Sequence, residues 1–301
     1  MLAIVVPYYK VSFFEETLRS LVSQTDKRFN VYIGNDGSNE NPDVLIEKYR
    51  GSVNLKYVAY KNNLGKDSLV NHWNRCMEMI ENEDWLMILG DDDVLESNVV
   101  ELYYQNIDAV EKTSSVIRFA SYKINNLGLK VSKKCVHPKI EKSSDFIFRN
   151  VRSSLSEYIF KTSKIKEIGF KNFPLAWYSD LLAVLEFSNF KEVFSINEAF
   201  VQIRISELSI SGNNTNLGEK SKARFEFYYL LLSKKRSKFS PEQIKELFRR
   251  LNTSYLNENK NIIYFYKITI LYYSNKKFKQ YFNFLGVIIG SLFKSKGVRF
   301  K

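Results

Sequence analysis

The sequence predicts an α/β fold, with a mixed, mainly parallel sheet flanked by helices and a helical C-terminal extension. Three observations predict it. Short β-rich runs alternate with amphipathic segments over the first hundred residues, and the connections between them are short. The run Trp85–Leu89 is apolar throughout and bounded by charge, which is typical of a strand buried on both faces. From residue 219 onward the pattern is helical and basic.

The elements of the first hundred residues follow from their patterns. Leu2–Pro7 is expected to be a strand that Pro7 ends, because proline has no N–H to donate. Ser12 and Glu15 have capping-box spacing, which predicts an amphipathic helix over 12–25. Then come a strand at 29–33, a helix at 42–49, a strand at 55–60, a turn at 62–65, a helix at 67–81 and the strand at 85–89.

After residue 112 the alternation weakens. We expect a strand at 116–123, a hairpin turn at 125–128 and a polar, mobile connection over 130–150. Gly169 is placed as the C-terminal cap of one helix, and Ser179 as the N-cap of another over 180–188. A strand or hairpin at 194–205 and a polar loop complete a domain of residues 1–218, followed by a helical region of 219–301.

Composition narrows the partners and the location. Lys and Arg number 45 against 33 Asp and Glu, a surplus that suits nucleotide phosphates, acidic lipid headgroups or nucleic acid. Cys76 and Cys135 form neither a disulfide framework nor a metal-site spacing, which indicates a reducing compartment. The start lacks signal-peptide features and no run reaches the roughly 18 apolar residues of a membrane span, so we expect a cytoplasmic protein.

The run 282–293 is apolar and has lysine or arginine on both sides. It is too short to span a membrane but suits the interface beside anionic lipids, so peripheral contact with the inner face of the cell membrane is expected. The alternative is a terminal helix packed on its own core.

Three carboxylates, Asp91, Asp92 and Asp93, follow the buried strand directly. They repel one another, and a divalent cation such as Mg²⁺ or Mn²⁺ would neutralise them. Right-handed crossovers place every loop that follows a parallel strand along one edge, where ligands bind in open α/β sheets. The alternative is an acidic turn before the helix that starts near Ser97, since anions are favoured at helix N-termini.

The loops that follow the strands resemble, in order, those of the family 2 glycosyltransferases of the GT-A fold, which invert the anomeric centre. The resemblance covers roughly residues 1–215. It is carried by Pro7-Tyr8-Tyr9, Asn35-Asp36-Gly37-Ser38, Asn63-Leu64-Gly65, Asn71-His72-Trp73-Asn74-Arg75, Asp91–Asp93, Ile168-Gly169-Phe170 and Trp177-Tyr178-Ser179-Asp180, and it ends around Arg204 and Ser209.

The resemblance implies a nucleotide site. Asp36 would accept the imide N–H of uracil or thymine; the alternative is a surface Asp-Gly turn. The other residues implied in nucleotide binding are Pro7 and Tyr9 under the nucleoside, Asn63 and Gly65 in the adjoining turn, and Asp91 on the ribose side.

The resemblance also implies the catalytic groups. Asp92 would hold Mn²⁺ or Mg²⁺ with Asp93 in support, and the ion would stabilise the departing diphosphate. Asp180 would be the general base, or only a carboxylate in the first turn of its helix. Arg204 offers charge to the pyrophosphate, or pairs with Glu207. The chain departs from the family where Gly90 replaces an acidic residue and Ser206 a histidine.

The expected function is sugar transfer from a UDP- or dTDP-sugar to a hydroxyl of a saccharide or lipid-linked saccharide, in capsule, O-antigen or exopolysaccharide assembly. No nucleic acid partner is expected. The alternatives are a nucleotidyltransferase, a sugar-nucleotide-binding protein without activity, and a nucleic-acid-binding protein that uses the basic C-terminal region. The first would need a glycine-rich loop after the first strand, which the sequence lacks.

Overall fold

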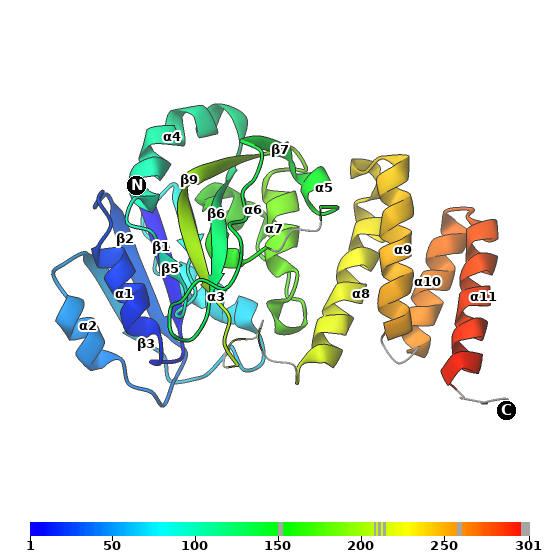
Figure 1. The fold of residues 1–301 in the computed structure, drawn as a ribbon, viewed down its shortest axis with the longest axis horizontal. Coiled ribbons are helices and arrows are strands. Elements are labelled where there is room, and N and C mark those ends of the chain that lie inside the picture. Colours follow the sequence, from blue (N-terminus) through cyan, green and yellow to red (C-terminus); the bar gives the residue numbers. More distant parts are fainter. Residues whose placement is uncertain (150–152, 208, 210–211, 213–214, 258–260, 296–301) are drawn as a thin grey trace. The chain divides into compact units, whose positions relative to one another are not determined.

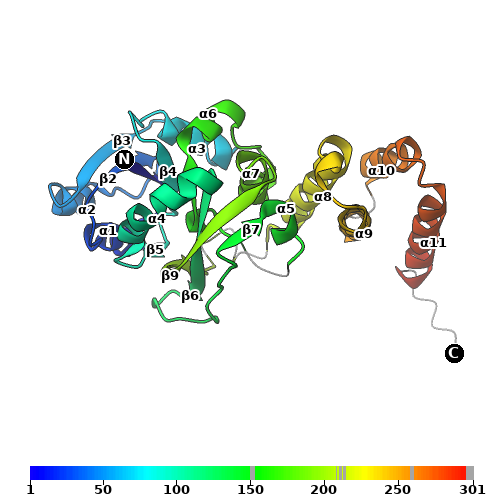
Figure 2. The ribbon, with the colours of Figure 1, turned by 90° about the horizontal axis from the view of Figure 1, so that it is seen from above.

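A computed structural model describes residues 1–149, 153–207, 209, 212, 215–257 and 261–295. The chain divides into two units, Met1–Asn214 and Thr215–Lys301. Figures 1 and 2 show the first unit as a twisted sheet with helices on its faces, and the second as a series of helices.

The first unit begins with alternating strands and helices. These are β1 (Leu2–Tyr8), α1 (Phe14–Val22), β2 (Phe29–Asn35), α2 (Asp43–Tyr49), β3 (Asn54–Ala59), α3 (Leu69–Met77), β4 (Trp85–Ile88), β5 (Val94–Leu95) and α4 (Val99–Thr113). It continues with β6 (Val116–Ile124), β7 (Ile140–Lys142), α5 (Ser143–Phe146), β8 (Tyr158–Lys161), α6 (Thr162–Ile168), α7 (Ser179–Phe187) and β9 (Glu192–Arg204).

The strands form one mixed sheet in the order β3-β2-β1-β4-β8-β6-β9-β5, with β7 paired to β9. The four N-terminal strands β3, β2, β1 and β4 run parallel. β8 is antiparallel to both β4 and β6, whereas β6 and β9 are parallel. The parallel pairings are the longer ones, so the predicted fold class is confirmed.

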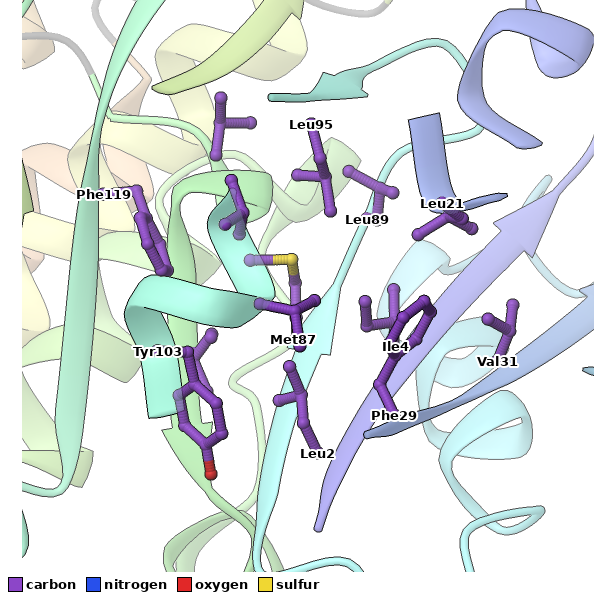
Figure 3. Packing of buried hydrophobic residues seen from close by; sticks show 14 of the residues in the cluster. Leu2, Ile4, Leu21, Phe29, Val31, Met87, Leu89, Leu95, Tyr103 and Phe119 are labelled. Atoms are coloured by element: carbon purple, nitrogen blue, oxygen red, sulfur yellow. The ribbon is translucent and has the colours of Figure 1, made fainter. Parts of the chain in front are cut away.

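One face of the sheet carries the core that positions the loops. Alternate residues of β1 and β4, among them Leu2, Ile4 and Met87, are fully buried and pack against Leu21 of α1 and Tyr103 of α4 (Figure 3). Burial of each such side chain stabilises the fold by about 1.5–3 kcal/mol. The loops at the carboxyl ends of these strands therefore stand on a rigid base.

β1 does not end at Pro7 as predicted, since Pro7 pairs with Gly34 and Tyr8 with Asn35. The Leu89 N–H donates to the Val5 carbonyl, so Val5 faces β4, and Pro7, two residues on, faces the same side. The β1–β4 register stops at Val5 and Ile88. No ladder bond is lost at Pro7, because β4 has already ended there.

Both predicted serine caps are wrong. The N-cap of α1 is Phe13 without a side-chain hydrogen bond, and that of α7 is Tyr178, while the Ser179 hydroxyl donates to the Lys171 carbonyl at 2.6 Å. By contrast, Gly169 caps α6 with φ +73°, as predicted. Turn geometry, which local sequence controls, was easier to predict than the side-chain partners of the caps.

The segment 130–149 is more ordered than the mobile connection expected over 130–150, of which residue 150 lies outside the described residues. It contains β7 and α5, and Ser121 and Cys135 form an antiparallel bridge. A buried ion-pair cluster fixes it, because Glu141 lies 2.8 Å from Arg118 and 2.6 Å from Arg149. The lysines of this segment, Lys130, Lys133, Lys134, Lys139 and Lys142, are exposed, so its order rests on strand pairing and on the ion pairs of Glu141 rather than on burial.

The second unit consists of α8 (Leu217–Lys234), α9 (Pro241–Asn257), α10 (Ile262–Ser274) and α11 (Phe278–Ser295). Its interior is aromatic and aliphatic, with Phe225 stacked on Tyr264 and Leu251 fully buried. Within the described residues, no helix has both the length and the apolar character needed to cross a membrane.

Candidate functional site

A cavity of about 980 Å³ opens at the carboxyl ends of β1, β2 and β4. Every residue that the sequence singled out for the site lines it: Pro7, Tyr9, Asp36, Asn63, Gly65, Asp91, Asp92, Asp93, Asp180 and Arg204. They come from the loops after three parallel strands, the turn before α3, the first turn of α7 and the end of β9. The fold therefore brings together side chains nearly 200 positions apart in the sequence.

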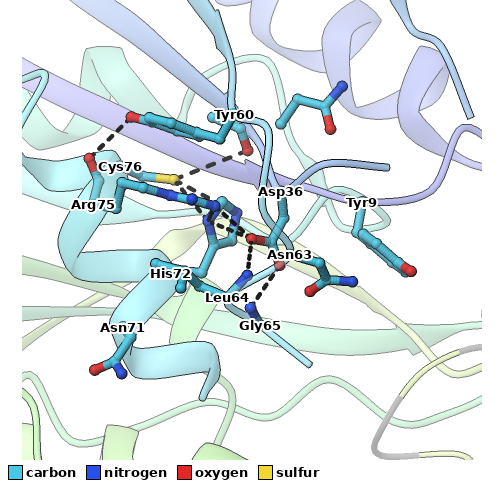
Figure 4. A network of polar contacts seen from close by, with 12 residues as sticks. Tyr9, Asp36, Tyr60, Asn63, Leu64, Gly65, Asn71, His72, Arg75 and Cys76 are labelled. Atoms are coloured by element: carbon cyan, nitrogen blue, oxygen red, sulfur yellow. Dashed lines mark hydrogen bonds and ion pairs between the residues drawn. The ribbon is translucent and has the colours of Figure 1, made fainter. Parts of the chain in front are cut away.

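Asp36 is buried and organises one end of the cavity (Figure 4). Its carboxylate accepts the N–H groups of Leu64 at 2.8 Å and Gly65 at 2.7 Å, and the guanidinium of Arg75 at 2.5 Å. The first two bonds fix the turn at 62–65 to the end of β2, and the third fixes α3 there. Asp36 is thus a buried charge that shapes the wall, not a residue of a surface turn.

Two residues of α3 that sequence reasoning did not place in the site support Asp36. Arg75 also stacks over the ring of Tyr60, 3.8 Å from its centroid. Its Nη2 lies 3.1 Å from Nδ1 of His72, and the same Nδ1 lies 3.3 Å from Oδ1 of Asp36, so the imidazole packs against both members of the pair. Burial, reinforced by Arg75 and opposed by Asp36, lowers the pKa of His72 to about 4.

Two glycines let the backbone approach this network. A Cβ on Gly65 would lie 2.5 Å from Oδ2 of Asp36, and one on Gly34 would lie 2.3 Å from the sulfur of Cys76. Neither contact is tolerable, since real Cβ atoms stay beyond 3.0 Å. Glycine is therefore required at both positions by space rather than by backbone conformation.

The three carboxylates after β4 have different partners. Oδ2 of Asp91 accepts the N–H groups of Tyr9 at 2.7 Å and Lys10 at 2.9 Å, which ties the β4 loop to the β1 loop. Asp93 is buried and accepts the Ser156 hydroxyl at 2.6 Å and the Arg204 N–H at 2.8 Å. Asp93 is therefore fully engaged in holding the loop.

Asp92 differs from its neighbours. Among the described residues, no other residue donates a hydrogen bond to its carboxylate, which accepts only from the Asp92 backbone itself, while the Asp92 carbonyl accepts from Nε of Arg204 at 2.9 Å. Burial, together with the charges of Asp93 and Asp91, raises the pKa of Asp92 well above its ordinary value, and Arg204 opposes this. The Asp92 carboxyl therefore lines the cavity beside two other carboxylates, where ionisation is costly, and a cation bound there would lower its pKa.

The acidic cluster fits a divalent ion that a substrate helps to hold. In the described part of the chain, no group of three or more His, Cys, Asp or Glu side chains is arranged as a metal site. Mg²⁺ typically binds one or two carboxylates together with substrate phosphates and water. Asp92 and the second oxygen of Asp91 have the chemistry for that role, whereas the bonds to Asp93 are already made.

Arg204 lines the cavity but is not held as the expected surface pair with Glu207. It is fully buried, its Nη2 pairs with Glu16 at 2.6 Å, and its Nη1 donates to the Asn125 carbonyl at 2.8 Å. The alternative of a surface pair with Glu207 is wrong. Arg204 therefore stabilises the acidic loop, and its positive charge lowers the free-energy cost of placing three carboxylates close together.

Asp180 lies across the cavity in the first turn of α7. Its Oδ2 accepts the Ser153 hydroxyl at 2.9 Å, and the Ser153 oxygen lies 2.7 Å from the hydroxyl of the buried Tyr158. Since Ser153 donates to Asp180, it must accept from Tyr158. The backbone just before it is strained, because Leu175, Ala176 and Tyr178 all have positive φ, a feature that clusters at functional sites.

The chain resembles proteins of known class. The sequence model of glycosyl transferase family 2 matches residues 3–172. S. aureus TarS 1–349 with UDP-GlcNAc has a TM-score of 0.63 at 17% identity, covering 85% of this chain and 72% of that one. For the same protein with UDP the values are 0.60, 17%, 87% and 72%.

A further solved structure, GalNAc-T7 with UDP, GalNAc and Mn²⁺, has a TM-score of 0.52 at 9% identity, covering 84% of this chain and 54% of that one. No curated protein matches the sequence. At these identities the structural matches speak for the fold, a mixed sheet flanked by helices.

Proposed function

The chain belongs to glycosyl transferase family 2, and from this premise we propose that it is an inverting, metal-dependent glycosyltransferase that uses a UDP- or dTDP-sugar donor. The observation that carries the proposal is the one cavity that the Asp36 network, the Asp180 carboxylate and the Asp92 carboxylate share, the last without a donor from any other described residue. A cavity of about 980 Å³ is large enough for a nucleotide sugar and part of an acceptor.

The nucleoside is proposed to lie at the Asp36 end. Oδ1 of Asp36 faces Leu64, Arg75 and His72, whereas Oδ2 takes one described bond, from Gly65, and would accept the imide N–H of uracil or thymine with its second lone pair. Pro7, Tyr9 and Asn63 would contact the nucleoside, and Asp91 the ribose. Support also comes from TarS, whose solved structures hold UDP and UDP-GlcNAc.

The diphosphate is proposed to face Asp92. When bound there, Mn²⁺ or Mg²⁺ supplies positive charge to the departing diphosphate. Asp92 would be its main protein ligand and Asp93 would keep the loop in place. Arg204 would act mainly through this loop, because three of its five N–H groups already serve Glu16, Asn125 and the Asp92 carbonyl, and the remaining N–H groups would be the source of any phosphate contact.

Asp180 is proposed to be the general base. In one displacement, the acceptor oxygen forms a bond to the anomeric carbon, the bond to the diphosphate oxygen breaks, and Asp180 takes the acceptor proton. Ser153 and Tyr158 would hold the carboxylate in position. The cavity wall near Asp180 carries Trp73 and Trp177, whose faces suit the apolar face of an acceptor sugar.

The acceptor is proposed to be a saccharide or lipid-linked saccharide, and the setting a cytoplasmic step of capsule, O-antigen or exopolysaccharide assembly at the inner face of the membrane. Family resemblance supports this part. The test of the whole function is the release of UDP or dTDP from a panel of their sugars with saccharide acceptors and Mn²⁺. Release that Asp180→Asn abolishes supports a transferase, whereas release that persists in Asp180→Asn, or its absence across the panel, contradicts it.

A further inference from the structure

The net positive charge of the protein lies in the second unit. Residues 215–301 hold 19 basic and 5 acidic side chains, whereas residues 1–214 hold 26 basic and 28 acidic. The last segment is the extreme case, since residues 261–301 hold eight basic side chains and no acidic one. A surface without acidic groups attracts anions over a distance of about 8–10 Å at physiological salt.

The same segment exposes large apolar side chains in a regular pattern. Ile263, Tyr266, Ile270 and Tyr273 recur at helical spacing along one face of α10, and Tyr266 is 65% exposed. The opposite face of α10 is buried in the unit, for example at Ile268. α10 is therefore apolar on two faces. One face packs in the unit, and the described part of the chain does not cover the other.

The pattern continues into α11. Phe278 and Phe282 lie one turn apart and are exposed, Phe282 by 65%. The rings of Tyr273 and Phe278 are in contact, with centroids 5.4 Å apart, so the exposed faces of the two helices meet at the turn between them. Exposed Lys276 and Lys279 flank this contact. We call the side chains of Ile263, Tyr266, Ile270, Tyr273, Phe278 and Phe282 the apolar stripe.

We propose that the apolar stripe of α10 and α11 docks the protein on the surface of a bilayer that contains anionic phospholipid. Aromatic and aliphatic side chains enter the boundary between headgroups and acyl chains, and the lysines remain among the headgroup phosphates. The charge around the apolar stripe favours an anionic bilayer over a second copy of the chain as its partner. A second copy would present the same surplus of lysines without a carboxylate to oppose it, whereas an anionic bilayer complements it.

Membrane docking rests on the location proposed with the function, at the inner face of the membrane. It does not require the sugar donor, so it is tested on the full chain without nucleotide. Sedimentation is measured with vesicles of phosphatidylcholine and of phosphatidylcholine with phosphatidylglycerol. We expect binding to the anionic vesicles only, reduced at high salt. The double variant Phe278→Glu with Phe282→Glu should lose at least tenfold in vesicle affinity, and Lys276→Glu with Lys279→Glu should show a loss of the same sign.

The matched control is Val44→Glu with Leu127→Glu, which changes two exposed apolar residues of the first unit and should leave binding intact. The variant Phe282→Trp gives a direct signal of docking. The three native tryptophans all lie before residue 215, so a blue shift of the added fluorescence on anionic vesicles would report on the apolar stripe. The proposal would be overturned if the protein bound both vesicle types equally or bound neither. It would also be overturned if the protein bound no lipid but self-associated, and the double variant at Phe278 and Phe282 abolished that self-association. UDP binding serves as the separate check on the transferase proposal.

Discussion

The guanidinium of Arg75 lies 2.5 Å from the carboxylate of Asp36, and the pair joins α3 to the end of β2 at the floor of the cavity. Asp36 is buried and also holds the amides of the following turn, so the geometry of that turn depends on a charge that only Arg75 balances directly. This relationship connects the stability of the fold with the shape of the proposed nucleotide site.

Arg75→Ala is expected to destabilise the protein by about 3 kcal/mol, because it leaves the Asp36 charge buried without its partner. The measurement is urea unfolding. Adding Asp36→Asn to Arg75→Ala should recover part of this loss, since the uncompensated charge is then gone. Additive losses in the double variant would show that the two side chains are not coupled.

Gly65→Ala is expected to weaken UDP binding at least tenfold, because the new Cβ would lie 2.5 Å from Oδ2 of Asp36 and must displace the carboxylate or the turn. Calorimetric titration measures this. Gly218→Ala is the control, since a Cβ at Gly218 meets nothing within 4 Å. Equal affinities for the two variants would mean that the turn does not contact the nucleotide.

Ser153→Ala is expected to lower kcat about tenfold and to leave the dissociation constant of UDP unchanged, because Ser153 positions Asp180 and lies away from the Asp36 end of the cavity. Asp180→Asn should lower kcat by about 10²–10⁴. Steady-state kinetics over a range of pH would separate positioning from binding. A change in UDP affinity for Ser153→Ala, with kcat intact, would assign the serine to the donor site instead.

His72 predicts a loss of stability in acid. Its pKa is about 4 in the folded protein against 6.5 ordinarily, so the unfolded chain binds the proton first as the pH falls. The contribution of neutral His72 to the free energy of unfolding is therefore fully present above pH 6.5 and is lost as the pH falls through about 4. The loss amounts to about 3 kcal/mol. His72→Asn, which keeps an acceptor for Arg75, should lose less stability than the wild type between pH 7 and pH 4.5.

His137, whose pKa burial and two arginines lower to about 3, acts with the same sign and is present in both proteins. It therefore cancels in the comparison. Parallel losses of unfolding free energy in wild type and His72→Asn would contradict the neutral, buried state of His72.

The sheet could be predicted because its signals are local. Apolar runs such as Trp85–Leu89 and the loops that follow them define parallel strands and the edge where their ligands lie, so the loops from Pro7 to Asp93 were predicted to line one crevice, whereas Asp180 and Arg204 were added by the family resemblance. The same local signals predicted the Gly169 cap. Chain order and strand polarity are enough for this level of description.

The partners within the site could not be predicted, because they depend on which buried groups meet across the fold. Arg204 belongs to β9 and Glu16 to α1, and no spacing in the sequence indicates their 2.6 Å pair. Likewise, residue pattern alone makes the three adjacent aspartates equivalent, and their different bonds, with Asp93 accepting from Ser156 and Arg204 and Asp92 from no other described residue, come from tertiary contacts. His72 and Arg75 did carry a signal, since they lie three residues apart on the helix that follows the nucleotide turn.

The central claim is a metal-assisted nucleotide site built on Asp36 and Asp92, and calorimetric titration of UDP, dTDP, GDP and ADP with and without Mn²⁺ tests it most directly. We predict that UDP or dTDP binds at least tenfold more tightly with Mn²⁺, that GDP and ADP bind weakly, and that Asp92→Asn removes the effect of Mn²⁺ while the protein stays folded. The absence of binding by every nucleotide to folded protein with Mn²⁺, or a metal effect that survives in Asp92→Asn, would contradict the account.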